Sequence, residues 1–318
     1  MAKKYTNTGN KDTRSGFGAG LLEAGRKNPD VVALTADLIG SVKMDAFVKE
    51  FPERFIQCGI AEANMIGTAA GLAITGKVPF AGSFAEFVTG RVYDQIRQEV
   101  AYGHTNVKIA SSHAGITLGE DGATHQTMED IALMRALPGM VVLNPCDYNQ
   151  CKAATIAAAE YEGPVYLRFG RPSMPNFTAE DQVFEIGKAI LMNEGKDVTI
   201  FATGHLVWEA VNAAELLEAE DVSAEVIDIA TIKPLDVEAV VASAKKTGAV
   251  VCAEEHNMCG GLGELIAGVL AANAPTPVEY VNGGDRFGQS GTPAELLQAY
   301  SMNAASIAEA AKRAVDRK

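Results

Sequence analysis

The sequence lacks any long apolar run, and this excludes a membrane-spanning protein. A membrane helix needs about 18 consecutive apolar residues, whereas the most apolar stretches, such as 60–74, are interrupted by Glu62, Asn64 and Gly67. Residues 1–14 are largely polar and contain no apolar core of a signal peptide. We therefore expect a cytoplasmic protein.

Cysteine and positive charge are also scarce. The five cysteines are Cys58, Cys146, Cys151, Cys252 and Cys259, an odd number without a Cys-x-x-Cys pair, so we interpret them as reduced and mostly buried rather than as zinc ligands. Forty acidic residues against 27 basic ones give a formal charge of −13. Such a field repels nucleic acid and anionic membrane surfaces, so neither is an expected partner.

Short apolar runs alternate with longer amphipathic stretches, and this pattern predicts an α/β fold of two consecutive domains, each a mainly parallel sheet flanked by helices. A length of 318 residues fits two domains of about 150 residues. A seam with two prolines at 171–176 separates domain 1–180 from domain 181–318. The expected strands are 31–35, 78–81, 107–111, 140–143, 165–168, 198–202, 224–229, 249–253 and 277–280, and the clearest helices are 61–74, 84–101, 148–161 and 304–318.

Several common catalytic signatures are missing. The glycine-rich segments 16–20 and 259–263 do not complete a dinucleotide or P-loop motif, so we interpret them as turns, although the second precedes a helical run whose N-terminus could hold an anion. No Gly-x-Ser-x-Gly nucleophile motif occurs. The histidines lack the spacing that places two imidazoles on one helical face, so no metal site is predicted within the chain.

Polar side chains are concentrated in the loop after the third expected strand. Residues 111–130 include His113, Asp121 and His125 and lie between a strand and a helix. Ligands of open parallel sheets bind past the carboxyl ends of the strands, so these side chains are candidates for contacting a ligand together. A solvated connection is the competing interpretation.

A second unusual segment is the small-residue helix that begins near Glu62. This carboxylate could simply stabilise the positive end of the helix dipole. Alternatively, its apolar neighbours Ile60, Ala61 and Met65 would shield it from water and suit it to share a proton with a basic nitrogen.

Three motifs together resemble one family. Residues 59–65 (GIAEANM), 79–87 (PFAGSFAEF) and 113–126 resemble the pyrimidine-binding domain of transketolases, and residues 254–256 and 285–291 resemble their C-terminal domain. The resemblance implies that Glu62 is catalytic and hydrogen-bonds the aminopyrimidine of the cofactor thiamine diphosphate, that Phe84 and Phe87 pack against this ring, and that Asp37 lies near the cofactor. A third aromatic expected three residues after Phe87 is replaced by Gly90.

The resemblance also implies a sugar-phosphate site. The matching positions are Arg14, Ser41, His113, Asp121, His125 and Arg171. Guanidinium, hydroxyl and imidazole groups suit a phosphate dianion. Asp121 and His125 would hydrogen-bond the sugar hydroxyls and the two-carbon unit, with His125 as a second catalytic residue.

One departure from the family pattern implies a partner subunit. Thiamine enzymes bind Mg²⁺ and the diphosphate through a Gly-Asp-Gly motif followed by an Asn, and this sequence has no such motif. We therefore expect the C-terminal subunit of a split transketolase in an α2β2 heterotetramer, with Mg²⁺ held by the separate diphosphate-binding subunit. The expected reaction transfers a two-carbon ketol unit from xylulose 5-phosphate to ribose 5-phosphate in the pentose phosphate pathway.

Three alternatives remain open. A split transketolase for a specialised sugar phosphate would carry the same motifs. The β subunit of a 2-oxoacid dehydrogenase shares the two-domain layout and a catalytic glutamate. A scaffold without catalytic activity would retain the fold, but it would not need the complete set of polar residues.

Overall fold

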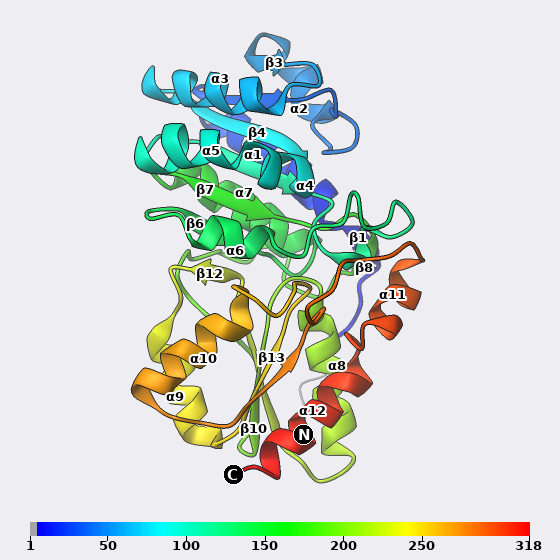
Figure 1. Cartoon of the computed structure of the whole chain (residues 1–318). Coiled ribbons are helices and arrows are strands. Elements are labelled where there is room, and N and C mark those ends of the chain that lie inside the picture. Colours follow the sequence, from blue (N-terminus) through cyan, green and yellow to red (C-terminus); the bar gives the residue numbers. More distant parts are fainter. Residues whose placement is uncertain (1–4) are drawn as a thin grey trace.

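A seven-stranded sheet forms the centre of the first domain in a computed structural model that describes residues 5–318 (Figure 1). The strand order is β12-β6-β7-β5-β4-β2-β3, in which β12 runs antiparallel to β6 and the other strands are parallel. The strands are β2 (Val31–Thr35), β3 (Phe55–Gln57), β4 (Val78–Phe84), β5 (Lys108–Ser112), β6 (Val141–Leu143), β7 (Val165–Arg168) and β12 (Thr231–Lys233). The parallel sheet and its five predicted strands are confirmed, whereas the three-residue strands β3 and β12 were not predicted.

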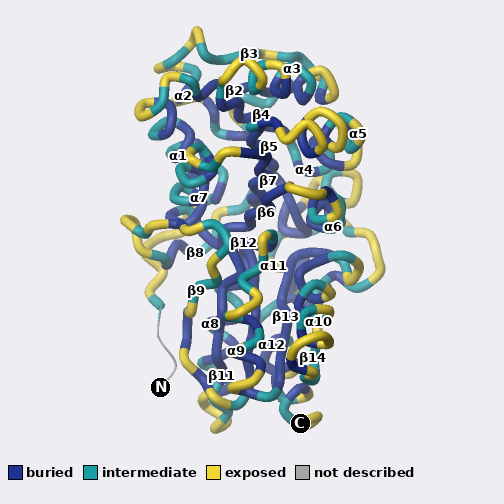
Figure 2. Tube along the Cα trace, turned by 90° about the vertical axis from the view of Figure 1, so that its left-hand side faces the viewer, coloured by how far each residue is buried: buried dark blue, intermediate teal, exposed yellow. Residues whose placement is uncertain are grey.

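Helices cover both faces of this sheet, which Figure 2 shows edge-on. One face carries α1 (Thr13–Lys27), α2 (Asp45–Glu50) and α7 (Tyr148–Glu160), and the other carries α3 (Glu62–Ile74), α4 (Ala85–Val88), α5 (Tyr93–Gln95) and α6 (Asp130–Arg135). Each face buries a separate apolar cluster, one around Phe17 and Phe80 and the other around Met65 and Ile109. The sheet is therefore buried on both sides, as parallel sheets require.

The prediction of a turn at residues 16–20 was wrong, because these glycines lie inside α1. A Cβ atom on Gly16 would fall 2.3 Å from the carbonyl oxygen of Tyr148, and one on Gly18 would fall 2.3 Å from that of Lys43. The glycines thus allow α1 to pack closely against α7 and against the loop before α2. This packing outweighs the low helix propensity of glycine.

The continuous helix predicted over 84–101 is also wrong. β4 extends to Phe84, and the chain then forms α4, a 3₁₀ turn at Gly90–Val92, α5 and a π-helical segment at Ile96–Tyr102. Thr89 leaves the helical region with φ −120° and ψ −80°, and its hydroxyl donates to the carbonyl of Ala85 at 2.6 Å. The hydroxyl thereby replaces the helical amide bond to this carbonyl, and α4 ends.

The second domain contains a five-stranded sheet in the order β14-β13-β10-β11-β9, with β9 antiparallel to β11. Its strands are β9 (Ile190–Asn193), β10 (Val198–Ala202), β11 (Ala224–Asp228), β13 (Val250–Ala253) and β14 (Val278–Val281). Its helices are α8 (Leu206–Glu218), α9 (Val237–Thr247), α10 (Leu262–Asn273), α11 (Pro293–Ala299) and α12 (Ala304–Val315). α8 and α12 cover one face of the sheet, and α9 and α10 cover the other (Figure 1).

The second half of the chain contributes a strand to the first sheet, because β12 pairs with β6. A separate small antiparallel pair joins β1 (Asn10–Asp12) to β8 (Ser173–Pro175) within the first domain. The proposed domain boundary after residue 180 falls between β8 and β9, and its position stays a prediction. Among residues 5–318, every helix is too short or too polar to span a bilayer.

The prediction of reduced, mostly buried cysteines is confirmed. All five are free thiols: Cys146, Cys151 and Cys252 are buried, Cys58 is half-buried and Cys259 is exposed. Burial raises the pKa of the Cys151 thiol beyond its ordinary range and that of Cys252 well above it. These buried thiols therefore act as small apolar side chains.

Candidate active site

The candidate residues gather at the carboxyl edge of the first sheet. Phe84 ends β4, His113 directly follows β5, and Arg171 follows β7. Asp37 lies on the loop after β2, and Glu62 begins the helix after β3. These strands are parallel, so their carboxyl ends meet at one edge, where open α/β sheets bind ligands.

The aromatic rings of two phenylalanines and two histidines pack against one another there. The rings of Phe84 and Phe87 are stacked with centroids 5.5 Å apart, and His113 stacks on Phe84 at 3.7 Å. His125 meets Phe87 edge-on at 5.4 Å. This arrangement offers a flat aromatic surface with two imidazoles beside it, which fits a planar heteroaromatic ring and a polar substrate next to it.

His113 is held in an unusual backbone conformation and an unusual protonation state. Its φ is +61°, and its Nδ1 lies 2.6 Å from the hydroxyl of Ser112. Burial, together with the positive charges of Arg14 and Arg171 and the nearby His125, lowers the pKa of His113 to about 3. The imidazole is therefore neutral at physiological pH.

Two guanidinium groups lie beside this neutral imidazole. Arg14 donates to the backbone carbonyl of Ser41 at 3.2 Å and lies 3.2 Å from Asp12. Arg171 donates to the carbonyl of Leu118 at 2.9 Å and lies 3.0 Å from the exposed Glu120. Burial, opposed by Asp12 and assisted by Arg171, lowers the pKa of Arg14. Each guanidinium already pairs with a carboxylate, and the two together with the neutral imidazole offer hydrogen-bond donors that suit an anion.

Glu62 is a buried carboxylate with a partner that the sequence analysis did not identify. Its side chain is only 5% exposed, and its Oε1 lies 3.1 Å from Nη1 of Arg91. The guanidinium of Arg91 also covers the Phe87 ring, 4.2 Å from its centroid. In the sequence, Arg91 directly follows Gly90, which stands where the third aromatic was expected. This departure from the family pattern was the feature of the sequence that could have pointed to Arg91.

Asp37 and Asp121 are exposed residues of two loops at the same edge. Asp37 adopts φ +62°, and its amide donates to the side chain of Gln57 at 2.8 Å. Asp121 lies in the middle of the loop between His113 and His125. The roles assigned to both aspartates stay predictions.

The donor set of the described residues indicates which groups this edge can bind. A buried carboxylate beside stacked aromatics fits the aminopyrimidine half of a thiamine cofactor, whose ring nitrogen needs a hydrogen-bond partner at its edge. Among residues 5–318, no cluster of three or more His, Cys, Asp or Glu side chains is arranged to hold a metal ion.

The second glycine-rich segment, 259–263, runs into the start of α10. The anion at this helix N-terminus is the buried carboxylate of Glu254, which accepts from the amides of Leu262 at 2.7 Å and Gly263 at 2.8 Å. This segment therefore has a structural role in the second domain.

Comparisons with known proteins agree with this geometry. Residues 10–176 match the model of the transketolase pyrimidine-binding domain, and residues 187–307 match that of the transketolase C-terminal domain. A Methanocaldococcus jannaschii protein named as a transketolase C-terminal section is 48% identical over 302 residues, covering 94% of this chain and 95% of that protein. The 6-deoxy-6-sulfo-D-fructose transketolase subunit of a Clostridium strain is 45% identical, covering 94% and 92%. A solved split-gene transketolase, an inactive β4 tetramer, matches with a TM-score of 0.89 at 46% identity, covering 97% of this chain and 99% of that one.

Proposed function

This chain belongs to the transketolase family, and we propose that it is the C-terminal subunit of a two-subunit transketolase that is active only with a separate diphosphate-binding subunit. The observation that carries the proposal is the full-length match to a relative named as a C-terminal section. The inactive tetramer formed by the β chains of a split-gene transketolase supports the need for a partner. We propose an α2β2 assembly in the cytoplasm.

The proposed reaction transfers a two-carbon ketol unit from a ketose phosphate, such as xylulose 5-phosphate, to an aldose phosphate, such as ribose 5-phosphate. Thiamine diphosphate, when bound, supplies the carbon nucleophile and the electron sink for breaking and forming the carbon–carbon bond. The partner subunit would hold its diphosphate and the Mg²⁺ ion.

Glu62, Phe84 and Phe87, which we call the cofactor slot, bind and orient the ring of the cofactor. Glu62 hydrogen-bonds the ring nitrogen from its buried position and thereby controls the proton there. Phe84 and Phe87 pack against the ring and exclude water from it. Asp37 lies near the cofactor on the loop after β2.

The neighbouring polar residues bind the sugar phosphate. Arg14 and Arg171 neutralise the phosphate, with Ser41 and the neutral His113 as hydrogen-bond partners. Asp121 bonds the sugar hydroxyls. His125, beside Phe87, bonds the hydroxyl of the two-carbon unit and moves a proton to or from it.

A specialised sugar substrate is the second candidate. The Clostridium relative is named for 6-deoxy-6-sulfo-D-fructose, whose sulfonate is also an anion. The pair of guanidinium groups at Arg14 and Arg171 suits either anion. The substrate of this chain therefore has to be decided by assay.

The test is to co-express the chain with the diphosphate-binding subunit of its own source and to assay transketolase activity with thiamine diphosphate and Mg²⁺. We expect activity with xylulose 5-phosphate and ribose 5-phosphate in the assembly and none in the chain alone. Activity only with 6-deoxy-6-sulfofructose would establish the specialised substrate. Activity of the chain alone would refute the need for a partner.

The matched variant is Glu62→Gln in the same assembly. It keeps the size of the side chain and removes the carboxylate, so we expect a loss of roughly a hundredfold or more in kcat. Unchanged activity would mean that the chain acts as a scaffold and that the proposed site is not used.

A further inference from the structure

The second domain holds the loop that carries His113, Asp121 and His125. The amide of Gly115 donates to the carbonyl of Thr127 at 2.9 Å and closes the base of this loop, residues 113–127, which we call the site loop. Three hydrogen-bond contacts connect the site loop to the second domain. The side-chain amide of Gln126 donates to the carbonyl of Gln289 at 3.0 Å, and the carboxylate of Glu255 accepts from the amide of Thr117 at 2.5 Å. The hydroxyl of Thr117 also lies 3.3 Å from Nδ1 of His205.

The Glu255 carboxylate is fully enclosed by these contacts. Its side chain is 3% exposed, and its second oxygen lies 3.6 Å from Nδ1 of the buried His205. A Cβ atom on Gly115, whose φ is +81°, would fall 2.6 Å from this carboxylate. The site loop approaches Glu255 so closely because a glycine occupies this position.

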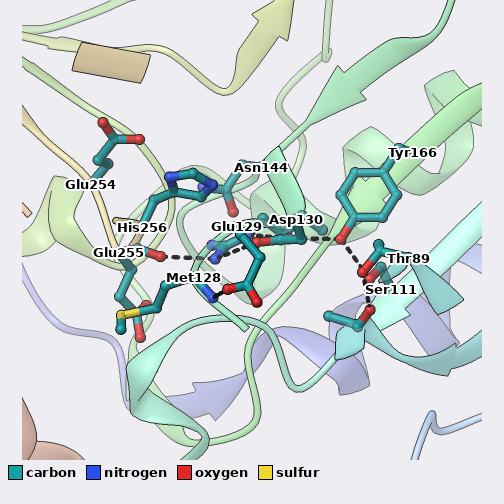
Figure 3. A network of polar contacts seen from close by, with 12 residues as sticks. Thr89, Ser111, Met128, Glu129, Asp130, Asn144, Tyr166, Glu254, Glu255 and His256 are labelled. Atoms are coloured by element: carbon teal, nitrogen blue, oxygen red, sulfur yellow. Dashed lines mark hydrogen bonds and ion pairs between the residues drawn. The ribbon is translucent and has the colours of Figure 1, made fainter. Parts of the chain in front are cut away.

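The backbone of Glu255 is also anchored, on the side of the first sheet. Its carbonyl accepts from Nη2 of Arg168 at 2.8 Å, and Arg168 forms a buried ion pair with Asp130 at 2.7 Å. Tyr166 donates its hydroxyl to the carboxylate of Asp130 at 2.7 Å (Figure 3). Glu255 therefore cannot shift without disturbing β7 or the start of α6, and it is a rigid support for the site loop.

The neighbouring carboxylate has a different role. Glu254 is 1% exposed and caps α10 within its own domain, through the amides of Leu262 and Gly263. Figure 3 shows the side chains of Glu254 and Glu255 extending in different directions. The chain thus offers two adjacent, similarly buried glutamates, of which Glu255 bonds the site loop and Glu254 bonds α10.

We propose that Glu255 is a positioning residue for sugar-phosphate binding: its carboxylate fixes Thr117, and through it the site loop that carries His113, Asp121 and His125. This inference rests on the proposed function. The second domain would then set the geometry of the substrate site without touching the substrate. Cofactor binding should depend less on Glu255 than sugar-phosphate binding does, because Glu62, Phe84 and Phe87 lie outside the site loop and meet it only through the rings of His113 and His125.

The test compares three variants in the assembly with the diphosphate-binding subunit. Glu255→Leu leaves the Thr117 amide without its acceptor. A hydrogen bond to a charged group contributes more free energy than a neutral one, so we expect the KM for the donor sugar phosphate to rise roughly tenfold or more. Glu255→Gln keeps an oxygen acceptor and should restore most of this loss. Glu254→Gln should leave this KM unchanged, and in Glu255→Leu the affinity for thiamine diphosphate should change less than the KM for the sugar phosphate.

Amide hydrogen exchange measures the loop directly and needs no substrate. We expect faster exchange at 115–119 in Glu255→Leu than in Glu254→Gln. Equal KM values in Glu255→Leu and the wild type, or an equal rise in Glu255→Leu and Glu254→Gln, would overturn the proposal. If the wild-type assembly shows no transketolase activity, the proposed function fails, whereas unchanged exchange in Glu255→Leu would refute the role of Glu255 by itself.

Discussion

His113 should make the folded chain sensitive to acid. Burial, with Arg14 and Arg171 nearby, lowers its pKa from 6.5 to about 3 in the folded state. Between these two values the unfolded chain binds a proton that the folded chain does not bind, so acid favours unfolding. The contribution of a neutral His113 to stability is therefore complete above pH 6.5 and is lost progressively as the pH falls toward 3.

The size of the effect follows from the same shift. One pKa unit corresponds to about 1.36 kcal/mol, and pH 5 lies about 1.5 units below the ordinary value, so the folded state should lose about 2 kcal/mol at pH 5 through this residue. His113→Asn removes the titrating group, and asparagine tolerates the positive φ of +61° better than most residues. The wild type should thus lose about 2 kcal/mol more than His113→Asn between about pH 7.5 and pH 5.

Urea unfolding followed by far-ultraviolet circular dichroism at several pH values measures this difference. His104→Asn is the control, because His104 is exposed and also has a positive φ, +48°. Equal losses of unfolding free energy in the wild type and His113→Asn would refute the reasoning. A direct check is the titration of the His113 ring protons by NMR, in which no protonation is expected above about pH 5.

Two further predictions concern packing and the cofactor slot. Arg91→Met removes a half-exposed partner that competes for Glu62, so thiamine diphosphate should bind the assembly a few-fold more tightly, as measured by titration calorimetry; weaker binding would show that Arg91 contacts the cofactor instead. Gly18→Ala places a Cβ atom 2.3 Å from the carbonyl oxygen of Lys43, so it should lower the free energy of unfolding by about 1–3 kcal/mol or more. Gly71→Ala is the matched control, because Gly71 lies on an exposed part of α3 with open space around it. In the isolated chain this variant should raise the free energy of unfolding by up to about 1 kcal/mol. Denaturant unfolding of both alanine variants decides whether close packing explains the first effect.

The sequence alone determined the fold class and most of the strands. The predicted bounds of β2, β7 and β10 match the structure, because buried parallel strands read as short continuous apolar runs. The family resemblance also pointed to Glu62, Phe84, Phe87, His113 and His125, and the structure brings them to one edge of the first sheet, while their roles stay predictions. Hydrophobic periodicity and local motifs are properties of neighbouring residues, and the sequence shows them directly.

Only the tertiary structure decided the features that depend on distant residues. The segment 16–20 is helical because Tyr148 and Lys43 pack against glycines that local propensity assigns to turns. β12 joins the first sheet, although its three residues lie in the second half of the chain. Arg91 pairs with Glu62 across 29 positions, and Glu255 holds Thr117 across 138. Close approach and burial arise from packing of distant segments, and no pattern of neighbouring residues records which partners will meet.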